Sequence, residues 1–213
     1  MIVLAIDTAL ETCSAAVVSG GRTLAARSEP MARGHQERLA PLVAEVMAEA
    51  GIGFDVLDRI GVTVGPGSFT GLRVGLAFAK GLGLALDRPV IGVGTLQAMA
   101  AGVPGCAAAV IDARREQVYV QAFRDGAPLT EPMALGLEDA ASALGVLDGG
   151  PSVLLGSGAP LLAQAFPAAR VESGSAPDPV RLAALAAAAE PATPQPVYLR
   201  APDAKLPASA LPA

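Results

Sequence analysis

The chain is poor in aromatic residues, histidine and cysteine, and each shortage excludes a class of site. Phe, Trp and Tyr make up only 3% of its 213 residues, so the core must be built from Ala, Leu and Val. His35 is the only histidine, which excludes a zinc site built on a pair of imidazoles and leaves one candidate base for a serine nucleophile. Cys13 and Cys106 are far apart in sequence and not in metal-like spacing, as expected for reduced thiols.

Basic residues are few and scattered. The net charge is −5 and the pI about 4.9, whereas binding to a polyanion usually needs a clustered basic face. We therefore expect the chain alone to bind nucleic acid weakly. No apolar run reaches the roughly 20 uninterrupted residues of a membrane span. The best candidate, residues 72–86, carries Arg73 and Lys80, and the N-terminus lacks the basic region of a signal peptide. We expect a cytoplasmic protein with no membrane association.

Hydrophobic and charged residues make up 52% and 16% of the chain, as in folded proteins with a large core. Patterning predicts an α/β fold in two lobes, 1–102 and 103–200, divided near Pro104, and a flexible Pro- and Ala-rich tail, 201–213. Both halves open with meander-like strands, a weak hint of duplication. Strands are predicted at 2–7, 13–19, 22–27, 60–64, 89–93, 107–112, 117–123 and 153–155, and helices at 37–50, 71–86, 95–101, 137–144, 160–166 and 179–190.

A glycine-rich turn between a predicted strand and a predicted helix is the most informative stretch. It reads GPGSFTGLR, residues 65–73, and lacks the Lys-Ser or Lys-Thr pair of a P-loop. Such a turn aims backbone N–H groups at whatever docks on the helix start, often an anion. Asp7 and Thr8, at the end of the first strand, could face a phosphate or its magnesium ion. The candidate nucleotide residues are therefore Asp7, Thr8, Gly67 and Ser68. The alternative is that Asp7 only caps its loop.

The predicted helix over residues 71–86 is apolar around most of its circumference. Its polar side is one narrow line, formed by Arg73, Lys80 and Asp87. Small residues four apart form a smooth ridge that allows close approach of another element: Gly71, Gly75, Ala79 and Gly83. A sheet can cover only one side of such a helix, so a second surface must cover the rest. The pattern leaves open whether that surface is the other lobe or another subunit.

Charged residues gather between two predicted strands of the second lobe: Asp112, Arg114, Arg115 and Glu116. They suit either a polar hairpin or the wall of a cleft between the lobes. Ser68 lacks the Gly-x-Ser-x-Gly surroundings of a hydrolase nucleophile, and no general acid–base pair stands out. We therefore predict no catalytic and no metal-binding residues.

Residues 65–73, with the continuation to Lys80 and Gly81, closely resemble the signature of the TsaB (YeaZ) family. Further blocks resemble that family in the same order: LAIDT at 4–8, VIGV at 90–93, IDAR at 111–114 and YLR at 198–200. The resemblance covers nearly the whole chain. It implies a reduced form of the ASKHA fold, the two-lobed architecture of actin, sugar kinases and Hsp70.

The resemblance also implies a function. TsaB is the dimerisation subunit of the bacterial machinery that makes threonylcarbamoyladenosine in tRNA. Its relative TsaD is catalytic and holds iron on a histidine pair, for which this chain has Thr95 and Met99. The resemblance therefore implies a non-catalytic scaffold that pairs with TsaD, works with TsaE, contacts tRNA only through the complex and forms a homodimer when alone. ATP or ADP would belong to the complex.

Pairing in this family is expected through the first two helices of the first lobe. The residues assigned to it here are Leu42, Val46, Gly71, Gly75, Ala79 and Leu82. Two other readings stay open. One is a free-standing ATPase or small-molecule kinase that uses Asp7, Thr8 and the glycine turn, and the other is a peptidase, which would need a nucleophile–base pair or a metal.

Overall fold

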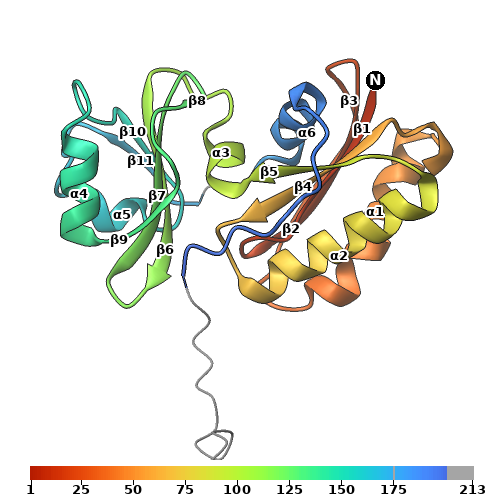
Figure 1. Cartoon of the computed structure of the whole chain (residues 1–213), viewed down its shortest axis with the longest axis horizontal. Helices are drawn as coiled ribbons and strands as arrows, with labels where there is room; N and C mark the ends of the chain where they lie inside the picture. Colours follow the sequence, from red (N-terminus) through yellow and green to blue (C-terminus); the bar gives the residue numbers. More distant parts are fainter. Residues whose placement is uncertain (175, 201–213) are drawn as a thin grey trace, which may run out of the picture.

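A computed structural model describes residues 1–174 and 176–200, which form two lobes side by side, each built on a mixed sheet (Figure 1). The first sheet has the order β3-β2-β1-β4-β5. Its strand β1 lies antiparallel to β2 and parallel to β4. The five strands are β1 (Ile2–Asp7), β2 (Thr12–Ser19), β3 (Arg22–Pro30), β4 (Arg59–Gly65) and β5 (Val90–Gly94). The α/β class is confirmed, and the predicted tail 201–213 lies outside the described residues.

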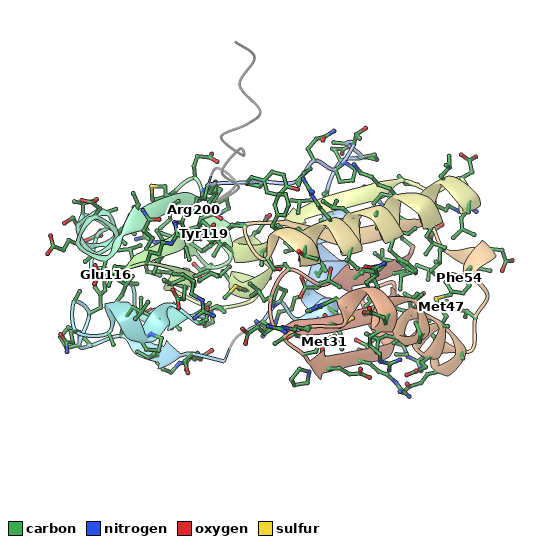
Figure 2. All side chains as sticks on the ribbon, turned by 90° about the horizontal axis from the view of Figure 1, so that it is seen from below. Met31, Met47, Phe54, Glu116, Tyr119 and Arg200 are labelled. Atoms are coloured by element: carbon green, nitrogen blue, oxygen red, sulfur yellow. The ribbon has the colours of Figure 1, made fainter. Side chains whose placement is uncertain are left out.

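Helices cover both faces of the first sheet. On one face lie α1 (His35–Ala50) and α2 (Phe69–Leu86), which Figure 2 shows lying next to each other. Their inward side chains join those of β1 and β4 in one core cluster, because alternate residues of these strands point to this face. The short helix η1 (Phe54–Val56) precedes β4. On the opposite face α6 (Pro179–Ala188) packs Leu182, Ala183 and Ala186 against Val3 and Ala5.

The position of α6 changes the predicted lobe boundary. Residues 103–200 were expected to form the second lobe, but α6 returns to the first sheet, where Gly61 leaves room for Ala186. The residues after α6 also run along the first lobe, with Val197 N donating to Val64 O at 2.7 Å. The order of helices and strands along a sequence does not indicate which sheet a helix covers. The small Ala-rich side chains of α6 would fit against either sheet, so its position could not be predicted.

The second sheet has the order β11-β10-β6-β7-β8, with β9 also paired to β7. It carries α4 (Leu137–Gly145) and α5 (Ala159–Leu162), while α3 (Thr95–Ala100) lies between the lobes (Figure 1). Its strands are β6 (Cys106–Arg114), β7 (Gln117–Arg124), β8 (Ala127–Pro128), β9 (Met133–Gly136), β10 (Val153–Leu155) and β11 (Arg170–Glu172).

By length and composition, α2 is a helix that could cross a membrane, with a mean hydropathy of 1.3. Its place in the fold gives another reason for this composition. One side of α2 packs on β4 and α1, and Leu72, Leu76 and Ala79 are buried there. Core helices pass the same test for this reason, so the composition of α2 is weak support for a membrane span.

Candidate nucleotide cluster and helix-pairing surface

The four candidate nucleotide residues do come together, at the end of β1. The Thr8 hydroxyl donates to Gly71 O at 2.7 Å, and Ser68 N donates to Ala9 O at 2.7 Å. A side chain on Gly67 would overlap Ala9 O, so glycine is needed for the turn to approach this loop. The glycine turn is therefore packed against the β1–β2 loop, and the Ser68 N–H, which could have faced an anion, is already bonded within the chain.

Ser68 has a second task as the N-cap of α2. Its hydroxyl accepts from Gly71 N at 3.3 Å and its carbonyl accepts from Leu72 N at 2.9 Å. An N-cap serine satisfies backbone N–H groups that a helix start otherwise leaves open. Ser68 thus fixes where α2 begins.

Asp7 is completely buried, and this decides its chemistry. Its Oδ1 accepts from the Thr63 hydroxyl at 2.6 Å and from Ala9 N at 3.0 Å, while Oδ2 has no hydrogen-bond partner among the described residues. Burial raises the pKa of Asp7 to about 6, and the two hydrogen bonds and the charge of His35 lower it only in part. A carboxylate that holds magnesium must be ionised and reachable, and Asp7 is not reachable from solvent here. Nucleotide binding at this cluster stays a prediction.

The charged cluster of the second lobe lies on the hairpin that joins β6 and β7. Three consecutive residues there have positive φ: Arg114, Arg115 and Glu116. The Arg114 guanidinium lies 3.4 Å from Asp112 Oδ2 and 3.9 Å from Glu11 Oε1, so it reaches across to the β1–β2 loop. The residues therefore form a polar hairpin, one of the two predicted descriptions, and its Arg114 faces the other lobe, while a role as a cleft wall stays a prediction.

A second glycine turn, next to this hairpin, was not predicted from the sequence. It follows β10 and reads Gly156-Ser157-Gly158, with the Ser157 hydroxyl accepting from Asp112 N at 3.1 Å. A side chain on Gly158 would meet Asp112 N at 3.0 Å, so the turn fits closely against the end of β6. The signal that could have found it is the Gly-x-Gly spacing directly after a short apolar strand and before Pro160.

His35 and the two positions matched to the iron ligands of TsaD, Thr95 and Met99, lie in different elements and have different contacts. His35 Nε2 lies 3.1 Å from Leu10 O, at the start of α1. Thr95 and Met99 are buried in α3, where Met99 joins the core of the second lobe. Within the described part of the chain, no three side chains of His, Cys, Asp or Glu are grouped as metal ligands.

The residues assigned to helix pairing lie mostly inside the first lobe. Leu42, Val46 and Ala79 belong to its core, Leu82 packs against that core, and Gly71 and Gly75 face the β1–β2 loop. A side chain on Gly75 would lie 2.5 Å from the Thr8 hydroxyl, so the smooth ridge of α2 serves approach to the chain's own loop. This corrects the assignment, because a partner cannot reach side chains that the lobe buries.

The outer face of α2 is the part that the fold leaves open. Among the helices and strands, α2 packs mainly on β4, α1, β1 and β5, which all belong to the first lobe, and Tyr198 contacts its first two turns. The exposed residues of this face are Arg73, Ala77, Lys80, Gly81, Leu84 and Ala85, and Leu84 is 87% exposed. A groove of about 540 Å3 runs between α1 and α2, lined by Gln36, Leu39, Phe69, Thr70, Arg73, Val74, Ala77 and Phe78. The second sheet and its helices therefore do not cover the outer face of α2.

Known proteins with similar sequences place this geometry in context. The family model described as TsaD, tRNA N6-adenosine threonylcarbamoyltransferase, matches residues 27–146. An uncharacterized protein of Mycobacterium tuberculosis is 41% identical over 206 residues, which cover 95% of this chain and 93% of that protein. The tRNA threonylcarbamoyladenosine biosynthesis protein TsaB of Escherichia coli is 40% identical over 124 residues, covering 56% of this chain and 53% of TsaB.

Solved structures agree with these sequence matches. YeaZ from Pseudomonas aeruginosa has a TM-score of 0.80 at 30% identity, with 93% of this chain and 99% of that chain covered. An activator of 2-hydroxyisocaproyl-CoA dehydratase from Clostridium difficile, solved with ADPNP, has a TM-score of 0.53 at 9% identity over 88% of this chain and 93% of that chain, which shows a shared fold alone. The expected two-lobed ASKHA fold is confirmed.

Proposed function

The chain belongs to the TsaB (YeaZ) family, and we propose that it is the non-catalytic subunit of a tRNA threonylcarbamoyladenosine synthesis complex, docking the catalytic subunit TsaD through the outer face of α1 and α2. TsaE would complete the complex, in the cytoplasm, and any ATP or ADP and most tRNA contact would belong to the partners. Without TsaD, the same face would pair two copies of the chain.

The observation that carries this proposal is the open face of α2. Leu84 is 87% exposed, and Ala77 and Gly81 lie on the same side of the helix, so an apolar strip points to solvent. Exposed apolar strips of this kind next to a groove mark interaction sites. Small side chains at the surface also let a partner helix come close, as helix pairs with short interaxial distances require.

The family match supports a partner that resembles this chain. The TsaD model matches residues 27–146, which include the whole of α1 and the whole of α2. TsaD therefore has a lobe with counterparts of both helices. Two like lobes can pair through the same face about a pseudo-twofold axis, as subunits of most soluble dimers do.

The buried cluster at the end of β1 supports a subunit without chemistry of its own. Asp7 is out of reach of solvent, and Ser68 N is bonded to Ala9 O instead of facing an anion. His35 is the only histidine and lies beside a backbone carbonyl. The candidate phosphate-site residues of a kinase are thus enclosed, and the one candidate histidine base of a peptidase has a backbone partner, which supports a subunit without catalysis.

The test is the affinity of the purified chain for purified TsaD, measured by calorimetry with two matched variants. Ala77→Glu places a charge in the groove on α2 without a β-branched or helix-breaking residue, so the lobe should stay folded. The control is Ala184→Glu, which puts the same charge on the exposed side of α6, on the opposite face of the first sheet. We expect Ala77→Glu to weaken binding at least about 30-fold, as for loss of a central contact, and Ala184→Glu to leave it unchanged.

Equal affinities for the wild type and Ala77→Glu would show that docking uses another surface. The free-standing ATPase reading makes a different prediction. If the chain alone turned over ATP at an enzyme-like rate and lost that activity in Asp7→Ala, the non-catalytic role would be refuted.

A further inference from the structure

Aromatic side chains, rare in this chain, gather along the groove between α1 and α2, and two of them meet at the end formed by the start of α2. The chain has five Phe and two Tyr, and three of these seven, Phe69, Phe78 and Tyr198, lie in or beside the groove. Tyr198 comes from the last described segment, residues 189–200, which we call the strap. Phe69 is 43% exposed and Tyr198 is 42% exposed, so two large apolar rings stay open to solvent at the same place.

An arginine holds these two rings together. The Arg73 guanidinium stacks on the Phe69 ring, 3.7 Å from its centroid, and Arg73 Nε donates to the Tyr198 hydroxyl at 3.2 Å. The two ring centroids are 5.2 Å apart and tilted by 40°. These contacts restrict the rotamers of all three side chains, so less side-chain entropy is left to lose when a partner binds. We call Phe69, Arg73 and Tyr198 the anchor cluster.

The strap is attached to both lobes on either side of Tyr198. Val197 N donates to Val64 O at 2.7 Å, and Gly65 leaves room for Val197 O, which a side chain there would approach to 2.6 Å. Arg200 Nη1 donates to Ala113 O at 3.0 Å, at the hairpin of the second lobe. Tyr198 is therefore held at the start of α2 by its neighbours, independently of any partner.

The anchor cluster has the properties of the centre of a binding site. Tyr and Arg, together with Trp, are enriched among the residues that dominate binding energies, which cluster in well-packed pockets. Phe69 and Arg73 also line the groove, so the cluster is continuous with the proposed docking face. Among the described residues, the terminal nitrogens of Arg73 have no hydrogen-bond partner, while α2 itself contains no acidic residue. A carboxylate of the partner could accept hydrogen bonds from these terminal nitrogens and form an ion pair with the guanidinium.

We propose that Tyr198 and the strap are part of the docking site for TsaD, with the anchor cluster receiving an apolar side chain and an acidic side chain of that partner. This rests on the proposed function above and adds to it a segment that is distant in sequence from both pairing helices. Docking then depends on α1, α2 and the strap together.

The experiment compares the affinity for purified TsaD of the wild type and two substitutions at Tyr198. Tyr198→Ala removes the ring and is expected to raise Kd about 10- to 100-fold. Tyr198→Phe keeps the ring and removes only the hydroxyl that Arg73 contacts, so we expect a rise of about two- to fivefold. Val146→Ala is the control, because it trims an exposed apolar side chain on the far lobe and should not change Kd.

The fold of each variant is checked by thermal unfolding, and Arg73→Gln gives a second route to the same cluster if Tyr198→Ala does not fold. A wild-type Kd for Tyr198→Ala, with Ala77→Glu still weak, would refute the role of the strap and leave the docking proposal intact. Wild-type affinity in both variants would refute the docking face itself. If Tyr198→Ala lost self-association but bound TsaD as the wild type does, the anchor cluster would bind a second copy of this chain and not TsaD, and the proposal would be refuted.

Discussion

Two glycines of α2 should respond in opposite ways to the same substitution. Gly81 and Gly75 lie six residues apart in one helix, and alanine adds one methyl group at either position. A side chain on Gly81 would meet nothing within 4 Å, whereas one on Gly75 would lie 2.5 Å from the Thr8 hydroxyl. The pair therefore separates the intrinsic helix preference from packing against the β1–β2 loop.

The magnitudes follow from the contacts at each site. Alanine is favoured over glycine inside a helix by about 1 kcal/mol, so Gly81→Ala should stabilise the fold by about that amount and raise Tm by about 2–4 °C. Gly75→Ala gains the same preference but must displace Thr8, whose hydroxyl donates to Gly71 O at 2.7 Å in a buried position. Overpacking costs about 1–3 kcal/mol and an unpaired buried hydroxyl costs a similar amount. The net effect should be a loss of about 1–5 kcal/mol.

The assay is urea unfolding of both variants and the wild type, at several protein concentrations because the proposed pairing of copies would add to apparent stability. A Gly75→Ala variant as stable as Gly81→Ala would refute the close packing of α2 on Thr8. A destabilised Gly81→Ala would refute the open outer face of α2. The same reasoning excludes Gly75→Leu as a test of pairing, because the larger side chain would damage the monomer first.

Two further predictions concern titration and thiol reactivity. Because burial raises the pKa of Asp7 to about 6, the folded state holds this proton more tightly than the unfolded chain. The contribution of Asp7 to the free energy of unfolding is therefore largest below a pH of about 4 and falls as the pH rises through about 6, by up to about 3 kcal/mol. In urea unfolding at a series of pH values, Asp7→Asn should lack this decrease. Burial also raises the pKa of the Cys13 thiol to about 11, so a thiol reagent at neutral pH should modify the half-buried Cys106 first and Cys13 only on unfolding; equal rates would contradict the burial of Cys13.

Sequence patterning located most of the elements because their apolar periods are strong. The strand predicted at residues 2–7 matches β1, and the helix predicted at 71–86 matches α2 apart from its first two residues. The short strands β8, β9 and β11 were missed, since two to four residues cannot show a period and none of the three is a fully buried apolar run like the VLL of β10, which was predicted. The helix predicted at 160–166 is only the single turn of α5, in a stretch where Pro160 favours a helix start and the first stop signal is Pro167.

The site was predictable as a cluster but not in its orientation. Asp7, Thr8, Gly67 and Ser68 do meet, since the ends of parallel strands β1 and β4 lie at one edge of the sheet. The polar line of Arg73 and Lys80 lies on the side of α2 away from the Gly ridge and marks that ridge as the inner side, but small residues four apart also suit a partner helix. That ambiguity is why the pairing residues were assigned to the inner side.

The glycine signature gains a physical explanation from this orientation. Gly65 leaves room for Val197 O, Gly67 for Ala9 O and Gly71 for Thr8 O, so each glycine meets the backbone of another segment of the chain. A side chain at any of these three glycines would clash with a backbone carbonyl. Such a carbonyl cannot rotate away as the end of a flexible side chain can, so the clash could not be relieved cheaply. The signature therefore fixes the start of α2 between the β1–β2 loop and the strap. If the strap is part of the docking site, the same three glycines set the position of both the helix and Tyr198, which would explain why a turn that resembles a phosphate loop serves an interface.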